Sequence, residues 1–274
     1  MTAQSPAKLS ANISQVDPIW HAIQAEAEEA ARKDPLLASF FYTSLISQPS
    51  LEDAVAHRVS ERLGHQDLSA DLLRQTFAAM REGWPEWSRV LRVDIQAVYD
   101  RDPAYNRFMD PVMYLKGFHA IQTHRLAHWL WNEGRVDLAY YLQSRSSAVF
   151  QTDIHPAAKF GSGIFLDHAT GLVVGETAVI EDNVSILHAV TLGGTGKIGG
   201  DRHPKIRHGV LIGAGAKILG NIEIGHCSKI AAGSVVLKPV PSNVTVAGVP
   251  AKVMGETGCA EPSRVMDHSI SNDE

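Results

Sequence analysis

The sequence contains little cysteine: two residues among 274, Cys227 and Cys259, without paired spacing. Disulfide frameworks and thiolate metal sites need more cysteines at defined spacings, so we expect neither. Long apolar runs are also missing, since none approaches the roughly 20 residues that a membrane helix requires. This excludes a membrane-spanning protein. The first residues lack the charged-then-apolar pattern of a secretory signal, and we therefore expect a reducing, cytoplasmic setting.

An excess of positive charge is missing as well. Asp and Glu number 30 against 25 Lys and Arg, which gives a formal net charge of -5 and a pI near 6.2. Nucleic acid and membrane surfaces attract basic patches, so the composition predicts neither as a partner. The 45% of hydrophobic residues and 20% of charged residues are ordinary for a globular protein of one large or two modest domains. Small-molecule chemistry remains the open class of function.

Apolar residues recur at helical spacing from Asp17 to about Phe150, which predicts an all-α domain over residues 1–151. Ser50 and Ser69 are placed as N-caps, and Gly64 as a left-handed helix stop. The expected helices cover residues 18–32, 51–63, 70–82, 90–98, 111–134 and 136–149.

The period changes to six after Thr152. Period six matches neither a helix nor a simple alternating strand, and it is typical of the hexapeptide repeats of parallel β-helices. Stacked coils of this kind pair at about 4.8 Å, so residues far apart in sequence line one surface. We expect this domain to span residues 152–254. The repeat leads are Ile154, Phe160, Leu166, Leu172, Val174, Ile180, Ile186 and Leu192, and then Ile206, Ile212, Ile218, Ile224, Ile230 and Val236.

Two segments fall outside the repeats. Residues 193–205 are rich in glycine and contain Lys197, Arg202 and His203, so they predict an extruded loop, either a lid over an anionic or acyl substrate or a simple excursion. Residues 255–274 are polar and without periodicity, which predicts a short disordered tail.

Several motifs go beyond the repeat. They are Tyr114-Leu115-Lys116-Gly117-Phe118-His119-Ala120, Asp153-Ile154-His155-Pro156-Ala157-Ala158, Asp167-His168-Ala169-Thr170-Gly171, Gly175-Glu176-Thr177, the loop 193–205, 213–221 and 247–251. Together they resemble bacterial serine acetyltransferases, and the resemblance covers about residues 94–250, with a looser match before that. It implies an α+β fold in which a left-handed parallel β-helix follows the all-α domain. It also implies transfer of acetyl from acetyl-CoA to L-serine, the first step of cysteine biosynthesis.

Acetyl transfer to a hydroxyl needs a base, and histidine suits that role at neutral pH. By resemblance, His168 is the general base and Asp153 is the acid that orients it. That pairing depends on the resemblance, because the sequence spacing does not establish contact. Cys227 lies outside these motifs, so we expect direct transfer between the two bound substrates and no thiol nucleophile.

Serine is a zwitterion, so its site should offer carboxylates to the ammonium group and cations to the carboxylate. Asp102, Asp167, Arg202 and His203 match the residues that do this in the family. Asp102, before Pro103, could instead simply end a helix, and Arg202 and His203 could be solvated loop residues. The resemblance also implies feedback inhibition by L-cysteine, which is nearly isosteric with serine.

CoA lies between neighbouring β-helices of a trimer in this family, where small residues and exposed backbone amides are needed. Gly194, Ala214 and Ala232 are the small residues we expect to contact it, with Lys229 at the phosphates. Each could instead be only a coil corner. We expect no metal. His155 precedes a proline in a motif that the resemblance already explains, and His188, His208 and His226 do not repeat the donor pattern of metal-binding β-helices.

The resemblance implies a homo-oligomer, either a trimer or a dimer of trimers. Family members typically end in an isoleucine that enters the active site of O-acetylserine sulfhydrylase, whereas Ile270 here is followed by four residues, two of them acidic. We therefore expect weak or absent binding to that partner. Two alternatives stay open: an acetyltransferase for a sugar or another amino acid, and a non-catalytic trimeric scaffold.

Overall fold

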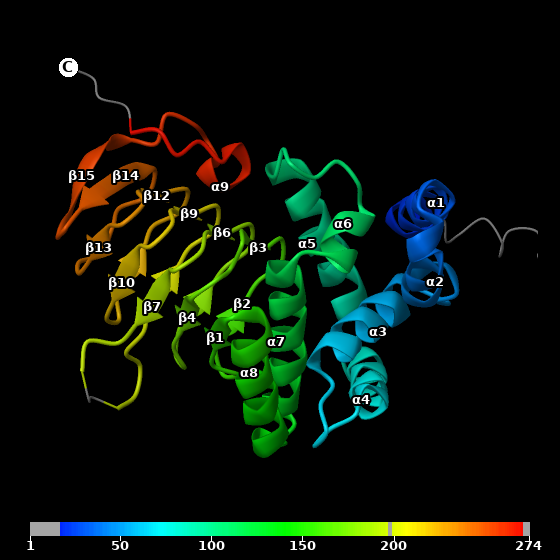
Figure 1. The fold of residues 1–274 in the computed structure, drawn as a ribbon. Coiled ribbons are helices and arrows are strands. Elements are labelled where there is room, and N and C mark those ends of the chain that lie inside the picture. The colour runs from blue at the N-terminus through cyan, green and yellow to red at the C-terminus, as the bar shows by residue number, and fades with distance from the viewer. Residues whose placement is uncertain (1–16, 197–198, 271–274) are drawn as a thin grey trace, which may run out of the picture.

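The computed structural model of the protein describes residues 17–196 and 199–270, and it comprises a helical half followed by a coiled stack of short strands (Figure 1). The helical half contains α1 (Pro18–Lys33), η3 (Pro35–Leu37), α2 (Ala38–Phe41), η4 (Tyr42–Ile46), α3 (Leu51–Leu63), α4 (Ala70–Gly83), α5 (Trp87–Arg101), α6 (Met109–Met113), α7 (Lys116–Asn132) and α8 (Val136–Phe150).

Side-chain caps begin three of the longer helices, as the sequence predicts. The carboxylate of Asp17 accepts the backbone N–H of Trp20 at the start of α1. The hydroxyl groups of Ser50 and Ser69 accept backbone N–H groups in the first turns of α3 and α4. Each cap satisfies one of the unpaired donors at a helix N-terminus.

Two details of the helical prediction are wrong. Gly64 has φ -52 and ψ 139, so it does not stop α3 in the left-handed conformation. It is needed for space instead, because a Cβ there would lie 3.1 Å from the backbone nitrogen of Ala70. The single helix expected over residues 111–134 is two helices, α6 and α7, because Leu115 has an extended backbone (φ -85, ψ 112) that redirects the chain.

The second half is a parallel coil of strands. It contains β1 (Thr152–Ile154), β2 (Lys159–Phe160), β3 (Phe165–Leu166), β4 (Leu172–Val174), β5 (Val179–Ile180), β6 (Ser185–Ile186), β7 (Thr191–Gly193), β8 (Lys205–Ile206), β9 (Leu211–Ile212), β10 (Lys217–Leu219), β11 (Glu223–Ile224), β12 (Lys229–Ile230), β13 (Val235–Val236), β14 (Val244–Gly248) and β15 (Ala251–Glu256), followed by the helix α9 (Pro262–Val265).

Strands β1–β14 form the three faces of a parallel β-helix, which confirms the predicted fold class, and β15 pairs antiparallel with β14 at its outer end. Sheet A has the order β1-β4-β7-β10-β13, sheet B has the order β11-β8-β5-β2, and sheet C has the order β15-β14-β12-β9-β6-β3. All the predicted repeat leads fall in strands, and all of them except the partly buried Phe160 are buried in one core between the sheets. The period of six thus follows from one inward side chain on each face.

The corners of the coil explain the small residues between the leads. Where sheet B turns into sheet C, five successive coils each place one residue at positive φ, between 53° and 74°. Glycine and asparagine tolerate this conformation best, and Cys227 occupies the same place in one coil. Cys227 is therefore a corner residue. The five residues are Gly163, Asn183, Gly209, Cys227 and Asn243.

The loop between β7 and β8 leaves the stack, as predicted (Figure 1). Lys197 lies outside the described residues. Residues 257–270 run across the outer face of sheet C and include α9. The hydroxyl of Ser185 donates to the carbonyl of Ser263 at 2.7 Å, and the ammonium of Lys229 donates to the carbonyl of Ser269 at 2.6 Å. Residues 271–274, which follow Ile270, lie outside the described residues.

A buried polar network joins the two halves. Asp94 on α5 is fully buried and pairs with Arg125 on α7 at 2.7 Å. The same carboxylate accepts the backbone N–H of Ile164, and Arg125 also donates to the carbonyl of Gly161. Asp94 of α5 thus satisfies a backbone donor of the first coil, and Arg125 of α7 satisfies a backbone acceptor of the same coil. These contacts fix the helical half against the β-helix.

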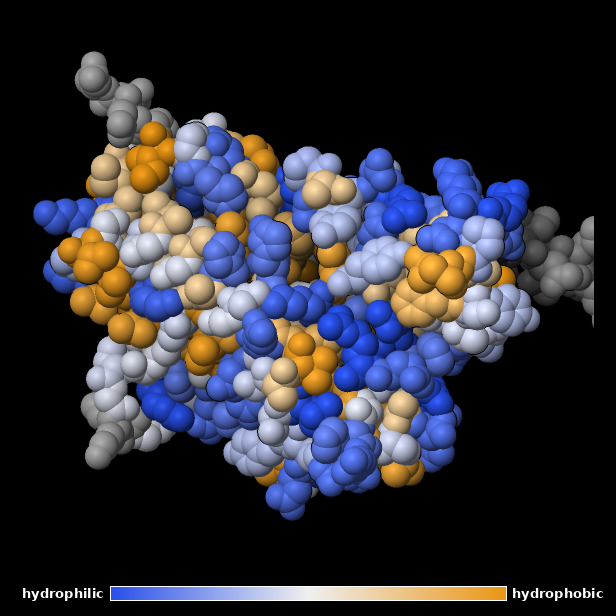
Figure 2. All heavy atoms as spheres, viewed as in Figure 1, coloured by the Kyte–Doolittle hydropathy of each residue, from blue (hydrophilic) through white to orange (hydrophobic). Residues whose placement is uncertain are grey.

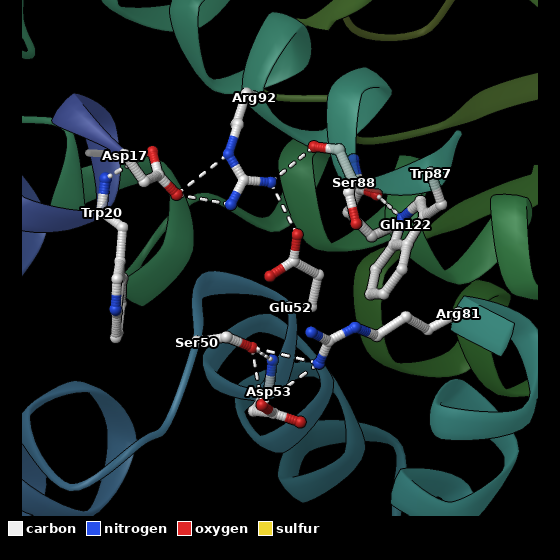
Figure 3. Close-up of polar contacts among 10 residues, drawn as sticks. All are labelled: Asp17, Trp20, Ser50, Glu52, Asp53, Arg81, Trp87, Ser88, Arg92 and Gln122. Carbon is white, nitrogen blue, oxygen red and sulfur yellow. Dashed lines mark hydrogen bonds and ion pairs between the residues drawn. The ribbon is translucent and has the colours of Figure 1, made fainter. Parts of the chain in front are cut away.

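A second network surrounds Arg92, which lies two residues before Asp94 on α5. The guanidinium of Arg92 donates to Asp17, to Glu52 at 2.6 Å and to the carbonyl of Ser88 at 2.6 Å (Figure 3). Nearby, Arg81 donates to the cap residue Ser50 at 3.3 Å. Arg92 thus holds the N-terminal ends of α1 and α3 to α5.

On the face seen in Figure 2, hydrophobic surface gathers at the outer end of the β-helix and over α2. Exposed apolar residues there include Val253 and Met254 of β15 and Leu36 beside α2. Within the described ranges, none of the helices is long and apolar enough to span a bilayer.

Candidate active site

A small pocket lies where the helical half meets the first coil. It is lined by Asp102 from the end of α5, by Asp167 and His168 from the corner after β3, and by the segment 114–117 at the start of α7. The pocket measures about 230 Å³. It therefore brings together three of the predicted site residues.

His168 projects from a strained corner. Its backbone φ is 56°, in the left-handed region that few side-chain-bearing residues adopt. Its side chain is 73% exposed, and its Nε2 lies 3.5 Å from a carboxylate oxygen of Asp167. An accessible imidazole held beside a carboxylate has the geometry that a general base requires.

Asp167 and Asp102 form an acidic wall. Partial burial raises the pKa of Asp167, the neighbouring His168 lowers it, and the like charge of Asp102 raises it further. One oxygen of Asp102 accepts the backbone N–H of Ala104 at 2.9 Å. Two neighbouring carboxylates of this kind favour a cationic group between them, such as an ammonium.

The register of sheet C places three predicted site residues and one further histidine in one column. Phe165 pairs with Ser185, Ser185 with Leu211, and Leu211 with Lys229, so the corners that follow these strands stack on one another. The imidazole ring centroids of His168 and His188, which follow the first two of these strands, lie 5.9 Å apart. We call this set the corner column; it consists of His168, His188, Ala214 and Ala232.

The corner column forms a continuous edge along the β-helix. Ala232 is exposed and Ala214 is partly exposed, so neither side chain fills the space beside the column. At about 4.8 Å per coil, Ala232 lies about 14 Å from His168. A long, narrow molecule can therefore extend along the edge with one end at His168.

Lys229 lies outside the corner column. It is on the outer face of sheet C and only 4% exposed, and its ammonium donates to the carbonyls of Asp267 and Ser269. Contact with a CoA phosphate stays a prediction, and it requires the segment around Asp267 to leave this face.

Arg202 and His203 lie together at the opposite edge of sheet A. The guanidinium of Arg202 donates to Glu176 at 2.6 Å, which lowers the pKa of that carboxyl. The hydroxyl of Thr177 accepts the backbone N–H groups of Arg202 and His203, each at 3.0 Å. The motif Gly175-Glu176-Thr177 thus fixes the returning end of the extruded loop.

The tautomer of His203 follows from its contacts. Its Nδ1 accepts the backbone N–H of Thr177 at 3.1 Å, so the proton of the neutral ring is on Nε2. Burial lowers the pKa of His203, and the adjacent Arg202 lowers it further. Gly175 leaves room for the ring, since a Cβ there would lie 2.0 Å from Nε2. Gly194 lies on the same side, where a Cβ would be 3.7 Å from Nε2.

Within one chain, the acidic pocket around His168 is separate from the basic pair Arg202 and His203. His168 precedes β4, whereas Arg202 and His203 contact the residues that follow β4. A strand of that length separates its two ends by about 10 Å. The acidic pocket and the basic pair therefore lie on opposite edges of sheet A.

Asp153 is not in contact with His168 through a hydrogen bond in this structure. It lies on the outer face of β1, where its carboxylate accepts the side-chain amide of Gln143 at 2.6 Å. The proposed pairing with His168 is thus not formed within this chain and stays a prediction.

Sequence reasoning missed the place of His188 beside His168, and the role of Thr177 in fixing the loop. The first could have been found by aligning the coils, because both histidines follow a repeat lead by two residues. The second depends on contacts across the extruded loop, for which the sequence carries no signal. In residues 17–196 and 199–270, no group of three or more His, Cys, Asp or Glu side chains is arranged as metal ligands.

Comparisons with known proteins identify the family. Residues 19–123 match a family model described as the N-terminal region of serine acetyltransferase, and residues 203–238 match the bacterial transferase hexapeptide repeat. The serine acetyltransferase of Salmonella typhimurium is 54% identical over 253 residues, covering 92% of this chain and 93% of that protein.

Solved structures are similar over nearly the whole fold. The serine acetyltransferase of Brucella abortus strain S19 in complex with coenzyme A has 78% sequence identity and a TM-score of 0.89, covering 90% of this chain and 99% of that one. A serine acetyltransferase in complex with cysteine has 50% identity and a TM-score of 0.90, covering 92% of this chain and 98% of that one. The chain belongs to the serine acetyltransferase family.

Proposed function

We propose that this protein transfers the acetyl group of acetyl-CoA to the hydroxyl of L-serine, giving O-acetyl-L-serine and CoA. The observation that carries the proposal is the corner column: a base, His168, lies at one end of an edge of small residues and beside an acidic pocket. The reaction is the first step of cysteine biosynthesis, and it converts the serine hydroxyl into an acetate leaving group.

The transfer needs one base and no covalent enzyme intermediate. His168 takes the proton of the serine hydroxyl as its oxygen attacks the thioester carbonyl carbon. The tetrahedral intermediate then collapses, the bond from carbon to sulfur breaks, and the protonated imidazole returns its proton to the CoA sulfur. His168 ends the cycle in its starting state.

Acetyl-CoA binds along the corner column. Its thioester lies at His168 and its pantetheine arm follows Ala214 and Ala232, where small side chains leave the backbone accessible. The complex of a relative with coenzyme A supports this co-substrate. Gly194 lies on the opposite edge of sheet A, so it contributes to the CoA site from a neighbouring copy.

Serine is bound by groups from two copies of the chain. Asp102 and Asp167 hold its ammonium, and Arg202 and His203 of a neighbouring copy hold its carboxylate. This arrangement is supported by the separation of the two groups on opposite edges of sheet A. A trimer in which each such edge faces the next copy would complete three equivalent sites.

L-cysteine competes for the same groups, because it differs from serine only in the atom that would attack. A relative has been solved in complex with cysteine, which supports this inhibitor. Feedback inhibition then follows from the serine pocket itself and needs no separate regulatory site.

The acceptor is tested by supplying purified protein with acetyl-CoA and one of L-serine, L-homoserine or a galactoside, and by following the release of CoA thiol. We expect release with L-serine to exceed that with the other acceptors by at least about 10-fold. Equal or faster release with a galactoside would instead establish the sugar acetyltransferase alternative.

A further inference from the structure

Arg101, the last residue of α5, is a buried cation that the proposed chemistry does not use. It is 5% exposed. Its guanidinium donates to the carbonyl of Gly163 at 3.0 Å, to the hydroxyl of Ser185 at 3.1 Å and to the side-chain carbonyl of Asn183 at 3.1 Å. Burial lowers its pKa to about 10.

With these partners, burial of Arg101 is unfavourable for the stability of the fold. All three acceptors are uncharged, and its Nε has no hydrogen-bond partner among the described residues. Its hydrogen-bond partners are thus all neutral, and the nearby carboxylates of Glu261, Asp100 and Asp94 act on it only at longer range, so burial still dominates and lowers its pKa. A role in fixing geometry explains what a stabilising role does not.

The three contacts fasten the end of α5 to two successive coils. Gly163 belongs to the first coil, while Asn183 and Ser185 belong to the second. The last turn of a helix is its least constrained part, because its carbonyl groups lack intrahelical partners. Asp94 fixes the middle of α5, and Arg101 fixes the end that Asp94 does not reach.

The fixed end is the one that carries the acidic wall. Asp102 follows Arg101 directly and is the C-cap of α5, where its N–H donates to the carbonyl of Val98 at 3.0 Å. Gly163, which Arg101 contacts, lies just before β3, and Asp167 of the serine pocket lies just after it. The Arg101 contact and the serine pocket are therefore at opposite ends of the same short strand.

We infer that Arg101 is a positioning residue that fixes the carboxylate of Asp102 opposite Asp167 by fastening the end of α5 to the first two coils. The inference depends on the proposed role of Asp102 in binding the serine ammonium. Substitution of Arg101 should therefore weaken the binding of serine and cysteine much more than it changes the maximal rate or the KM of acetyl-CoA.

The main test is Arg101→Lys, which keeps the charge but cannot reach three acceptors at once. We expect the KM of serine and the inhibition constant of cysteine to rise between about 10-fold and 100-fold, since small displacements of a binding group have effects of this size. The kcat at saturating serine and the KM of acetyl-CoA should change by less than about 3-fold. An unchanged serine KM would overturn the inference.

A second variant and a matched control separate positioning from general loosening of α5. Ser185→Ala removes one acceptor of Arg101, together with the donor to the carbonyl of Ser263, without changing any charge, and it should raise the serine KM in the same direction by a smaller factor. Arg92→Lys weakens the contacts of the same helix with Asp17 and Glu52 (Figure 3). It should lower the melting temperature and leave the serine KM unchanged. An equal rise of the serine KM in Arg92→Lys would contradict positioning by Arg101.

The Asp102→Asn background distinguishes the inference from the proposed function. If Arg101 acts through Asp102, Arg101→Lys has no further effect on the serine KM once Asp102 is replaced. The same rise in both backgrounds would show that Arg101 acts elsewhere. If Asp102→Asn alone has the serine KM of the wild type, the proposed role of Asp102 fails, and the inference fails with it.

Discussion

At the residue scale, the basic half of the site depends on the absence of one side chain. The imidazole of His203 occupies the space where a Cβ on Gly175 would lie, 2.0 Å from Nε2 and 2.1 Å from Cδ2. A contact below 3 Å requires something to move, and the ring is held by Thr177 on its other side. The position of His203 is therefore sensitive to a single methyl group.

We predict that Gly175→Ala raises the KM of serine between about 10-fold and 100-fold, because the displaced imidazole no longer meets the substrate carboxylate. Steady-state kinetics at varied serine measures this. Gly199→Ala is the control, since nothing lies within 4 Å of a Cβ at that loop position. Wild-type serine KM in Gly175→Ala would remove His203 from the serine site.

The acidic half of the site predicts a pH dependence. The pKa of Asp167 is raised, so as pH falls through this value the carboxyl becomes neutral and loses its attraction for an ammonium. Serine binding should therefore weaken on the acid side at a pH above the ordinary range of aspartate, about 3.9. Calorimetric titration of serine at a series of pH values measures the midpoint.

Asp102→Asn tests the cause of that shift. The charge of Asp102 is one of the causes that raise the pKa of Asp167, and its removal should move the midpoint of serine binding to lower pH. A midpoint that stays in place or moves to higher pH would show that the two carboxylates do not act on one ligand.

At the element scale, α5 determines how the helical half meets the β-helix. The fully buried Asp94 holds α7 through Arg125 and the first coil through the backbone of Ile164. Gly117 at the start of α7 packs close to the same coil, because a Cβ there would lie 2.0 Å from the carbonyl oxygen of Leu166. The pocket is thus built between elements with little freedom to separate.

Asp94→Asn should destabilise the protein strongly, by about 3–5 kcal/mol, because Arg125 then remains buried without an opposite charge. Chemical denaturation at fixed protein concentration measures the loss. Asp71→Asn removes the partner of Arg74 where the aspartate side chain is 74% exposed, and it should cost no more than about 1 kcal/mol. Similar losses in the two variants would contradict the account of this junction.

Local signals in the sequence were sufficient for most elements. Ser50 and Ser69 cap their helices, and the repeat leads such as Ile180 and Ile212 point into one core, because capping and a period of six act within a few residues. The break at Leu115 was missed because it follows from packing of α7 on β3, a contact between distant parts of the chain.

The candidate site was predicted less completely than the fold. Motifs identified Asp102, Asp167 and His168, which the structure places in one pocket. They could not show that Lys229 is covered by the tail or that Asp153 pairs with Gln143, because these contacts depend on the path of segments without periodicity. The separation of Arg202 from the pocket likewise needed the register of the coils.

At the scale of the whole molecule, the proposed site requires two copies of the chain. His168 and Arg202 lie on opposite edges of sheet A in one chain. A site formed between copies predicts that two inactive variants complement each other, because a mixed trimer can pair an intact edge of one copy with an intact edge of the next.

Co-expression of His168→Ala with Arg202→Ala should therefore restore activity at low serine to about one quarter of the wild-type value, the fraction of edges paired correctly by chance in a cyclic trimer. Each variant alone, at the same protein concentration, provides the baseline. No recovery in trimers shown to contain both chains would place the whole site within one copy.

The most direct test of the central claim is the turnover of His168→Ala with acetyl-CoA and L-serine, measured as CoA thiol release from an assembled variant that still binds both substrates. The account predicts a loss of about 10² to 10⁴ in kcat, because the imidazole acts on the serine proton and its exposed side chain contributes little to packing. Near-normal turnover in that variant would contradict the assignment of His168 as the base.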